Sequence, residues 1–427
     1  MRTRPCVCPL LLLALAVVWA PAARAQKKMS VGDRNVALEI LKVMKKDLER
    51  YYFDPEFQGV DVEARFAQAE QIIREKATNL NAAFRMIAWA MDGLNDSHTM
   101  FLQPPRPFDH TFGWTMQIVG DECVVTGVKP GSDAEAKGLK AGDVVVSLNG
   151  VPVVRGSFWK IQYLINVLDP QPGLRLVARS PEGEERTVDV LAKIKQSPRV
   201  VRSLYVDFLK WQKFRRRMRQ QYIEVGDDVL VWKLPTFAVH ERAIDGGIKR
   251  AREKRALVLD LRGNPGGLVD TLLRMIGSLF DRDVEVATTK YRKKEEEEKA
   301  ETRGDKAFTG ELWVLVDSGS GSAAEIMARV IQLEGRGRVL GDRTSGKVMQ
   351  SRYHDHEVGL YRVILYGAAI TNADVIMKDG KSLEHVGVMP DEVVLPTPAD
   401  IAAGRDPVLA YAVGLAGAKV SPEEAGS

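Results

Sequence analysis

Cysteine and histidine are scarce in this sequence. Its 427 residues include three cysteines and six histidines. Cys6 and Cys8 fall in an apolar N-terminal segment, so Cys123 is the single cysteine of the rest of the chain. Once that segment is removed, a disulfide within one chain is excluded. His354 and His356 stand close together, but no ligand set with metal-binding spacing accompanies them, and we expect neither a metal nor an organic cofactor.

A large excess of charge of one sign is also missing. The chain has 61 lysines and arginines against 57 acidic residues, a net charge of +4. This balance is too slight to indicate a nucleic-acid partner. The basic run Trp211–Gln221 is typical of a solvated linker or helix face. The charged run Tyr291–Lys306 is typical of an exposed, mobile loop or helix, and we assign no chemistry to it.

The apolar run near the start of the chain is too short to be a comfortable transmembrane helix. Arg2 and Arg4 precede it, Leu10–Trp19 form it, and the A-x-A signal Ala23–Ala25 follows. This order predicts a signal peptide over residues 1–25 and no stable membrane insertion after its cleavage, with an uncleaved anchor as the alternative. The absence of a cysteine at the cleavage point argues against a lipoprotein. An exported chain without disulfides fits a bacterial periplasm or the extracellular space.

The remaining sequence has the composition of an ordinary soluble protein and divides by pattern. Residues 26–102 show helical spacing of apolar side chains. Residues 103–195 hold short β-branched runs between turn signals, which predict a small β-sandwich or barrel with two helices. Residues 196–412 alternate apolar strands with amphipathic helices and predict an α/β core around a buried sheet, and residues 413–427 are expected to form a C-terminal tail. The fold class is therefore α+β multidomain.

The stretch Gly319–Lys347 carries the candidate chemistry. Ser322 follows the apolar strand LWVLVDS and the loop GSG, and it precedes the helix AAEIMARVIQ. A serine at such a junction has its oxygen at the helix N-terminus, where the N–H of Ala323 points toward any nearby anion. An acyl-transfer nucleophile needs this arrangement because the tetrahedral intermediate carries an oxyanion. The alternative is that Ser322 only caps the helix, with Glu325 completing a capping box.

Lys347 stands at the end of the same stretch, after the strand and glycine turn VLGDRTSG. In an α/β unit this strand returns the chain to the N-terminus of the helix that begins after Ser322. Burial and the positive end of that helix would lower the pKa of Lys347, and a neutral lysine can take the proton of a serine. The alternative is a surface lysine. A hydrolase that acts on bonds other than peptide bonds is disfavoured, since no G-x-S-x-G elbow accompanies the serine.

These features resemble the C-terminal processing, or tail-specific, serine peptidases of family S41. SGSGSAAEI and GRGRVLGDRTSGKVMQS resemble the family's signature, LVLDLRGNPGGLVDTLL its strand and glycine turn, LNDSHTMFLQP the element before its PDZ domain, and SLEHVGVMPDEVV its closing motif. The resemblance covers roughly residues 31–412 and rests on ordered motifs. It implies Ser322 as nucleophile, Lys347 as general base, and an oxyanion hole made by the N–H groups of Ala323 and Gly267.

The middle segment also resembles a PDZ domain, through VTGVKPGSDAEAKGLKAGDVVVSLNGVPV. PDZ domains bind an extended peptide C-terminus by strand addition and hold its carboxylate with backbone N–H groups. The resemblance places this carboxylate loop at Phe112, Gly113, Trp114 and Thr115. The implied partners are unfolded or tailed proteins and peptides, and an oligomer is left open.

The identity of the base is also left open. In the family a glutamine four residues after the lysine orients it, whereas Gln350 here lies three residues after Lys347. The sequence therefore departs from the lysine-base pattern at the residue that would hold the lysine.

Ser97, His98 and Glu384 resemble a second arrangement, that of tricorn-type relatives. There the imidazole is the base for the nucleophile, here Ser322, and the carboxylate orients or stabilises it, with the second serine assisting. The sequence predicts an exported serine endopeptidase with Lys347 as the base, and the site with His98 as the base is the alternative. A non-catalytic, peptide-binding scaffold that keeps the fold is the alternative from another functional class.

Overall fold

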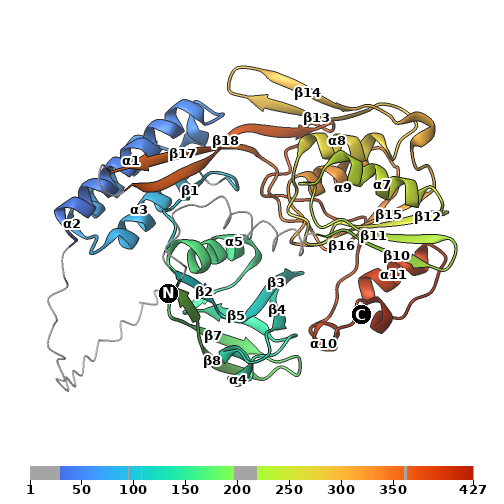
Figure 1. Ribbon diagram of the computed structural model, residues 1–427, viewed down its shortest axis with the longest axis horizontal. Coiled ribbons are helices and arrows are strands. Elements are labelled where there is room, and N and C mark those ends of the chain that lie inside the picture. The colour runs from blue at the N-terminus through green and yellow to red at the C-terminus, as the bar shows by residue number, and fades with distance from the viewer. Residues whose placement is uncertain (1–28, 95, 107, 197–218, 360–362, 427) are drawn as a thin grey trace, which may run out of the picture.

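The computed structural model describes residues 29–94, 96–106, 108–196, 219–359 and 363–426 (Figure 1). The predicted signal peptide and most of the basic run 211–221 lie outside these residues. Among the helices that are described, none is both long and apolar enough to cross a membrane.

Three helices form a layer at the N-terminal side of the molecule: α1 (Val31–Tyr51), α2 (Val62–Glu75) and α3 (Leu80–Asp92), with a short 3₁₀ turn at Phe57–Gly59. Each helix begins at a polar residue whose side chain accepts a backbone N–H, as N-caps do: Ser30, Asp61 and Asn79. The helical prediction for this region is confirmed. The layer does not close a core alone, because Tyr366, Ala368 and Ile370 of a distant strand complete it.

That strand is β18 (Ile364–Met377), which runs across the upper part of the molecule, below β14, in Figure 1. Its first half pairs with β1 (Met100–Leu102) and with β17 (Gln350–Val358), and its second half pairs with β13 (Val284–Tyr291). Through β18, the segment that carries Ser97 and His98 is held against the α/β core.

The charged run 291–306 does not form the exposed loop or helix that we expected. It contains β14 (Glu295–Ala300), an edge strand that pairs with β13, followed by a short 3₁₀ turn at Gly304–Lys306. Its residues alternate between more and less exposed, as one face of the strand turns toward the protein. Strand pairing thus overrides the low β-propensity of a glutamate run.

The α/β core is built on a second, six-stranded sheet. Its order is β10-β11-β12-β15-β16-β19, and every pair after the first is parallel. The strands are β10 (Gln221–Val225), β11 (Val229–Lys233), β12 (Ala256–Asp260), β15 (Glu311–Val316), β16 (Arg338–Gly341) and β19 (Glu392–Val393). Helices α7 (Glu241–Ala251), α8 (Val269–Gly277) and α9 (Ala323–Leu333) pack on one face. The predicted buried sheet is confirmed.

The C-terminal residues cover the other face of this sheet. Helix α11 (Pro407–Leu415) packs there, and the short helices α10 (Pro398–Ala402) and α12 (Pro422–Ala425) flank it. Val413 and Ala416 have no exposed surface. The prediction of a tail from residue 413 is therefore wrong: small and β-branched side chains there complete an apolar cluster under the sheet.

The middle segment forms a compact β domain with two helices, as predicted. Its sheet follows the order β3-β4-β5-β7-β8, with β6 paired to β5. The elements are β3 (Trp114–Val119), β4 (Glu122–Val128), α4 (Asp133–Ala136), β5 (Val144–Leu148), β6 (Val151–Pro152), α5 (Arg155–Tyr163) with the π-helical turn Leu164–Leu168, β7 (Gly173–Arg179) and β8 (Glu185–Leu191). A ribbon of β2 (Phe108–Thr111) and β9 (Lys193–Gln196) lies where the chain enters and leaves the domain.

Candidate active site

Three loops meet at the carboxyl ends of β12, β15 and β16, which are neighbours in the parallel sheet. They carry Gly267, Ser322 and Lys347 respectively. Ligand and catalytic sites of parallel α/β sheets are found at this edge because the loops converge there. The fold therefore brings together the three positions that the sequence motifs place far apart.

Ser322 sits at the sharp junction between β15 and α9. Its backbone has φ +52° and ψ −119°, a left-handed conformation that is costly for a residue with a side chain. The N–H of Ser322 donates to the carbonyl of Lys347 at 2.9 Å and to the Glu325 carboxylate at 3.1 Å, and these bonds hold the strained turn. The serine side chain makes no cap hydrogen bond to the helix. The hydroxyl is therefore left for other chemistry.

Glu325 is fully buried in the first turn of α9 and organises the loop that carries Lys347. Its carboxylate accepts hydrogen bonds from the hydroxyls of Thr344 and Ser345 and from the N–H groups of Gly346 and Lys347, besides that of Ser322. Burial raises the pKa of Glu325, and these hydrogen bonds oppose the shift. The predicted capping contact is thus one part of a larger clamp between two loops.

The glycine turn after β12 lies directly against Ser322. A Cβ on Gly266 would stand 2.6 Å from the Cβ of Ser322, and one on Gly267 would stand 2.2 Å from the N of Ala238. Both glycines have positive φ, +100° and +153°. Within the described part of the chain, the N–H groups of Gly267 and Ala323 donate no hydrogen bond. They are free to bind an oxyanion on the carbon that Ser322 would attack.

A hydrogen-bonded chain links Glu384, Ser97 and His98. The Ser97 hydroxyl donates to one Glu384 oxygen at 3.0 Å, and the Ser97 N–H donates to the other at 2.7 Å. The same hydroxyl lies 2.7 Å from Nδ1 of His98. Because the hydroxyl hydrogen is used toward Glu384, Nδ1 carries the imidazole proton and donates to Ser97. Nε2 is then the basic nitrogen of the ring.

The surroundings of His98 favour the neutral imidazole. Burial lowers the pKa of His98 to about 4, with a raising contribution from Asp96 and a lowering one from the charge of Lys347. Burial raises the pKa of Glu384, and hydrogen bonds from the N–H groups of Val348 and Ser97 oppose this. An imidazole that is neutral at pH 7 can accept a proton.

Lys347 lies close to an aromatic ring and borders the same cavity as Ser322 and His98. Its Nζ is 5.6 Å from the centre of the Trp159 ring, which belongs to α5 of the β domain. Burial lowers the pKa of Lys347, while the charges of Glu325 and Glu384 oppose the shift. Within the described residues, no hydrogen bond joins the Ser322 hydroxyl to Lys347 or His98.

Gln350, the expected partner of Lys347, points elsewhere. Its side-chain oxygen accepts a hydrogen bond from the Tyr291 hydroxyl at 3.1 Å. The structure does not bring Gln350 to Lys347 as a hydrogen-bond partner. The glutamine opens β17, and the pairing of that strand with β18 is irregular at this residue.

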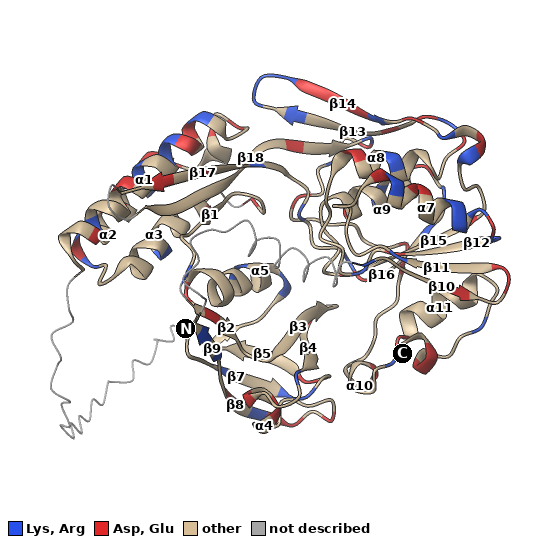
Figure 2. Cartoon of the chain, in the orientation of Figure 1, with Lys and Arg blue, Asp and Glu red and all other residues tan. Residues whose placement is uncertain are grey.

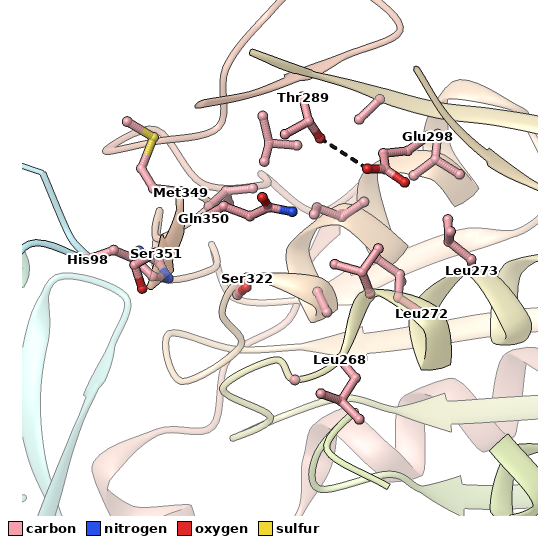
Figure 3. A pocket seen from close by; sticks show the side chains of 18 residues that line it. His98, Leu268, Leu272, Leu273, Thr289, Glu298, Ser322, Met349, Gln350 and Ser351 are labelled. Carbon is pink, nitrogen blue, oxygen red and sulfur yellow. Dashed lines mark hydrogen bonds between the residues drawn. The ribbon is translucent and has the colours of Figure 1, made fainter. Parts of the chain in front are cut away.

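Two cavities meet at Ser322. One, of about 360 Å³, is lined by Ser322, Ala323, Gly267 and His98 and extends between α8 and β13 (Figure 3). The other, of about 410 Å³, lies between the core and the β domain and is lined by Ser322, Ser97, His98, Lys347 and Trp159. His98 and Ser322 therefore face both cavities, whereas Lys347 faces only the second.

The predicted carboxylate loop lines a groove of the β domain. Phe112, Gly113, Trp114 and Thr115 border a cavity of about 670 Å³ together with residues of α5 and of the turn that continues it. β3 is an edge strand of its sheet, so its outer side can pair with an added strand. The four residues are thus gathered at one place, beside an open sheet edge.

The β domain touches the loop that leads to Ser322. Gln117 of β3 donates to Asp317 at 2.7 Å, and the Ser318 hydroxyl donates to the carbonyl of Ile118. Arg155 of α5 forms an ion pair of 2.7 Å with Asp342, just after β16. Our reading of the sequence missed these contacts and Trp159, since only the amphipathic spacing of α5 was visible there.

Residues 228–394 match the sequence profile of peptidase family S41, and residues 124–179 match that of a PDZ domain. A probable CtpA-like serine protease of Staphylococcus aureus is 26% identical over 294 residues, 67% of this chain and 52% of that protein. A chloroplastic C-terminal processing peptidase of Tetradesmus obliquus is 26% identical over 370 residues, 82% and 76% of the two chains. The chain thus spans about half the length of the Staphylococcus protein.

Solved structures show the same fold. Mature CPAF complexed with lactacystin has a TM-score of 0.66 at 16% identity, covering 90% of this chain and 98% of that one. The photosystem II D1 C-terminal processing protease has a TM-score of 0.50 at 20% identity, covering 85% and 93%. In the part of the chain that the structure describes, no group of three or more His, Cys, Asp or Glu side chains is placed to hold a metal ion.

The burial of neutral His98 predicts a pH dependence of stability. Its folded-state pKa of about 4 lies below the ordinary value of about 6.5 for an unfolded chain. As pH falls between these values, the unfolded chain takes up a proton that the folded chain does not. Stability is therefore lost over this window, by about 2–3 kcal/mol from His98 alone.

Denaturant unfolding at several pH values, compared between the native chain and His98→Gln, isolates this contribution. We expect the native chain to lose more stability than the variant on acidification. Equal losses in the two proteins would contradict the neutral, buried histidine. His240→Gln is the matched control, because His240 caps α7 at an exposed position.

Proposed function

We propose that the chain, whose residues 228–394 match peptidase family S41, is a serine endopeptidase in which Ser322 is the nucleophile and His98 is the general base. The observation that carries the proposal is the hydrogen-bonded chain Glu384–Ser97–His98, which ends on the same cavity as Ser322. This chain of hydrogen bonds supports the imidazole tautomer that a base requires. This arrangement corresponds to the second of the two sites that the sequence left open.

In the proposed reaction, Ser322 Oγ attacks the carbonyl carbon of a peptide bond and Nε2 of His98 takes the hydroxyl proton. The N–H groups of Ala323 and Gly267 bind the oxyanion, and the positive end of the α9 dipole adds to its stabilisation. The imidazolium then gives its proton to the leaving amine. A water molecule, activated by the same imidazole, hydrolyses the acyl–serine ester.

A second assignment of the base rests on Lys347. Burial lowers its pKa, and it lines the cavity between the core and the PDZ domain that also holds Ser322. Its weakness is the missing orienting group, since the oxygen of Gln350 is bound by Tyr291. In the histidine assignment, Lys347 contributes a positive charge beside the site and helps to keep His98 neutral.

The substrates that this site fits are unfolded or tailed proteins and peptides, delivered through the PDZ groove. The contacts of β3 with Asp317 and Ser318 join that groove to the loop that positions Ser322. A tail added beside β3 would therefore act on the nucleophile's own loop. We also propose that the chain is exported, on the basis of the signal-peptide pattern in residues 1–25.

Cleavage of casein tests the proposal and separates the two bases. We expect Ser322→Ala to lower kcat/KM by about 10³-fold or more, and His98→Ala to do the same, because each removes a member of one catalytic unit. Lys347→Ala should retain measurable activity. His240→Ala, at the N-cap of α7, and Lys249→Ala, on α7, are the matched controls and should be unaffected.

Three results would change the account. A dead Lys347→Ala beside an active His98→Ala would make lysine the base. Full activity of Ser322→Ala would remove the proposed nucleophile. A native chain that cleaves neither casein nor tailed peptides but binds the latter would be the non-catalytic scaffold.

Tail recognition is tested by calorimetric titration of Ser322→Ala with paired peptides that end in a free carboxylate or in an amide. We expect the carboxylate form to bind about tenfold more tightly or better, since hydrogen bonds to a charged acceptor are worth about 1.5–3 kcal/mol. Gly113→Ala should abolish the difference, because its Cβ would stand 2.4 Å from that of Ser132 and displace the loop. Gly156→Ala, where a Cβ meets open space, is the control, and equal affinity of both peptides would contradict the assignment.

A further inference from the structure

The cavity between α8 and β13 is apolar along its length and acidic at its far end. Its walls include Leu268, Leu272, Ile326 and Val348. Glu298 also lines it, at the end away from His98 and close to Thr289, as Figure 3 shows. An ionisable group at the end of an apolar pocket beside a nucleophile is a candidate determinant of specificity.

Glu298 differs from the other glutamates of β14, the acidic strand at the upper edge of the molecule in Figure 2. The other three each form an ion pair with a lysine: Glu295 with Lys290, Glu296 with Lys294, and Glu297 with Lys299. Among the residues that the structure describes, no cation lies within ion-pair distance of Glu298. The one side-chain hydrogen bond that Glu298 makes to the described residues is long, 3.5 Å from the Thr289 hydroxyl.

The electrostatic surroundings leave this carboxylate uncompensated. Burial raises the pKa of Glu298, the charges of Glu296 and Asp270 raise it further, and the Thr289 hydrogen bond opposes the shift. A cation that entered the pocket would meet an acceptor with free lone pairs in a partly desolvated setting. Charge-assisted hydrogen bonds in such a setting are among the stronger polar contacts in proteins.

We propose that Glu298 selects a lysine or arginine side chain at the residue whose carbonyl Ser322 attacks. This inference rests on the proposed peptidase function. The carbonyl oxygen of that residue would bind the N–H groups of Ala323 and Gly267, and both residues line this cavity. The side chain of the same residue branches from the Cα that is bonded to the carbonyl carbon, so it can enter the cavity that the two oxyanion donors line.

The shape and chemistry of the cavity match a long basic side chain. The methylene stem of lysine or arginine would lie along the leucine and valine walls, and its charged end would reach Glu298. An acidic side chain would be repelled, and an uncharged chain of similar length would gain only the apolar contact. The apolar walls thus bind any long side chain of the substrate, and Glu298 discriminates basic side chains from uncharged and acidic ones.

Quenched peptides Ala-Ala-X-Ala-Ala-Ala, with X as lysine, arginine, norleucine or glutamate, test this assignment in the native chain. We expect kcat/KM to be highest for lysine and arginine. Glu298→Gln should lower it about 10- to 100-fold for these two residues and leave norleucine unchanged. Glu297→Gln is the matched control, because that carboxylate is paired with Lys299 and does not line the cavity.

A binding measurement on Ser322→Ala separates this inference from the proposed function. Its affinities for the lysine and norleucine peptides are compared with and without the added change Glu298→Gln. If the native chain cleaves the peptides with no preference for a basic residue, the peptidase stands and the inference fails. If nothing is cleaved, a Glu298-dependent preference in binding upholds the inference without the peptidase, and equal affinities overturn it.

Discussion

The candidate site depends on one buried carboxylate, that of Glu325. It lies in the first turn of α9 and accepts hydrogen bonds from the N–H of Ser322 and from the loop after β16. A buried carboxylate is tolerated only when its oxygens are satisfied, and here the satisfaction comes from the two loops that must be held together. The strained backbone of Ser322 persists because this clamp over-determines it.

Strand β18 supplies a second constraint, at the scale of the whole molecule. One half of it completes the helical layer, and the other half joins the sheet beside the core. His98 precedes β1 and Glu384 follows β18, so the pairing of these two strands brings both residues to the edge where Ser322 lies. The relay through Ser97 is therefore a consequence of strand register between segments 287 residues apart in sequence.

Much of the fold and part of the candidate site could be predicted from the sequence, for physical reasons. The apolar strands and amphipathic helices of the core have clear periods, and the Ser322 and glycine-turn motifs follow strands whose ends meet in any parallel sheet. The sequence could not choose between His98 and Lys347, because that choice depends on where side chains point. The hydrogen bond between Gln350 and Tyr291 and that between Ser97 and Glu384 depend on the tertiary structure.

The predictions for residues 291–306 and 413–427 were wrong for equally specific reasons. The glutamate run of β14 is unfavourable for a strand by composition, and only its pairing with β13 makes it one. As a consequence, the sequence indicates no role for Glu298, although this residue lines the cavity beside Ser322. The residues after 412 are short of large apolar side chains, yet Val413 and Ala416 fit a crowded space that larger groups would not.

The proposed mechanism requires that a neutral His98 activates Ser322. It is tested most directly by the rate at which a fluorophosphonate probe labels Ser322, located by mass spectrometry, as a function of pH. We expect a labelling rate that holds through neutral pH and falls only as pH approaches about 4, the pKa of His98. A rate that instead rises through an alkaline inflection, and loses that inflection in Lys347→Ala, would contradict it.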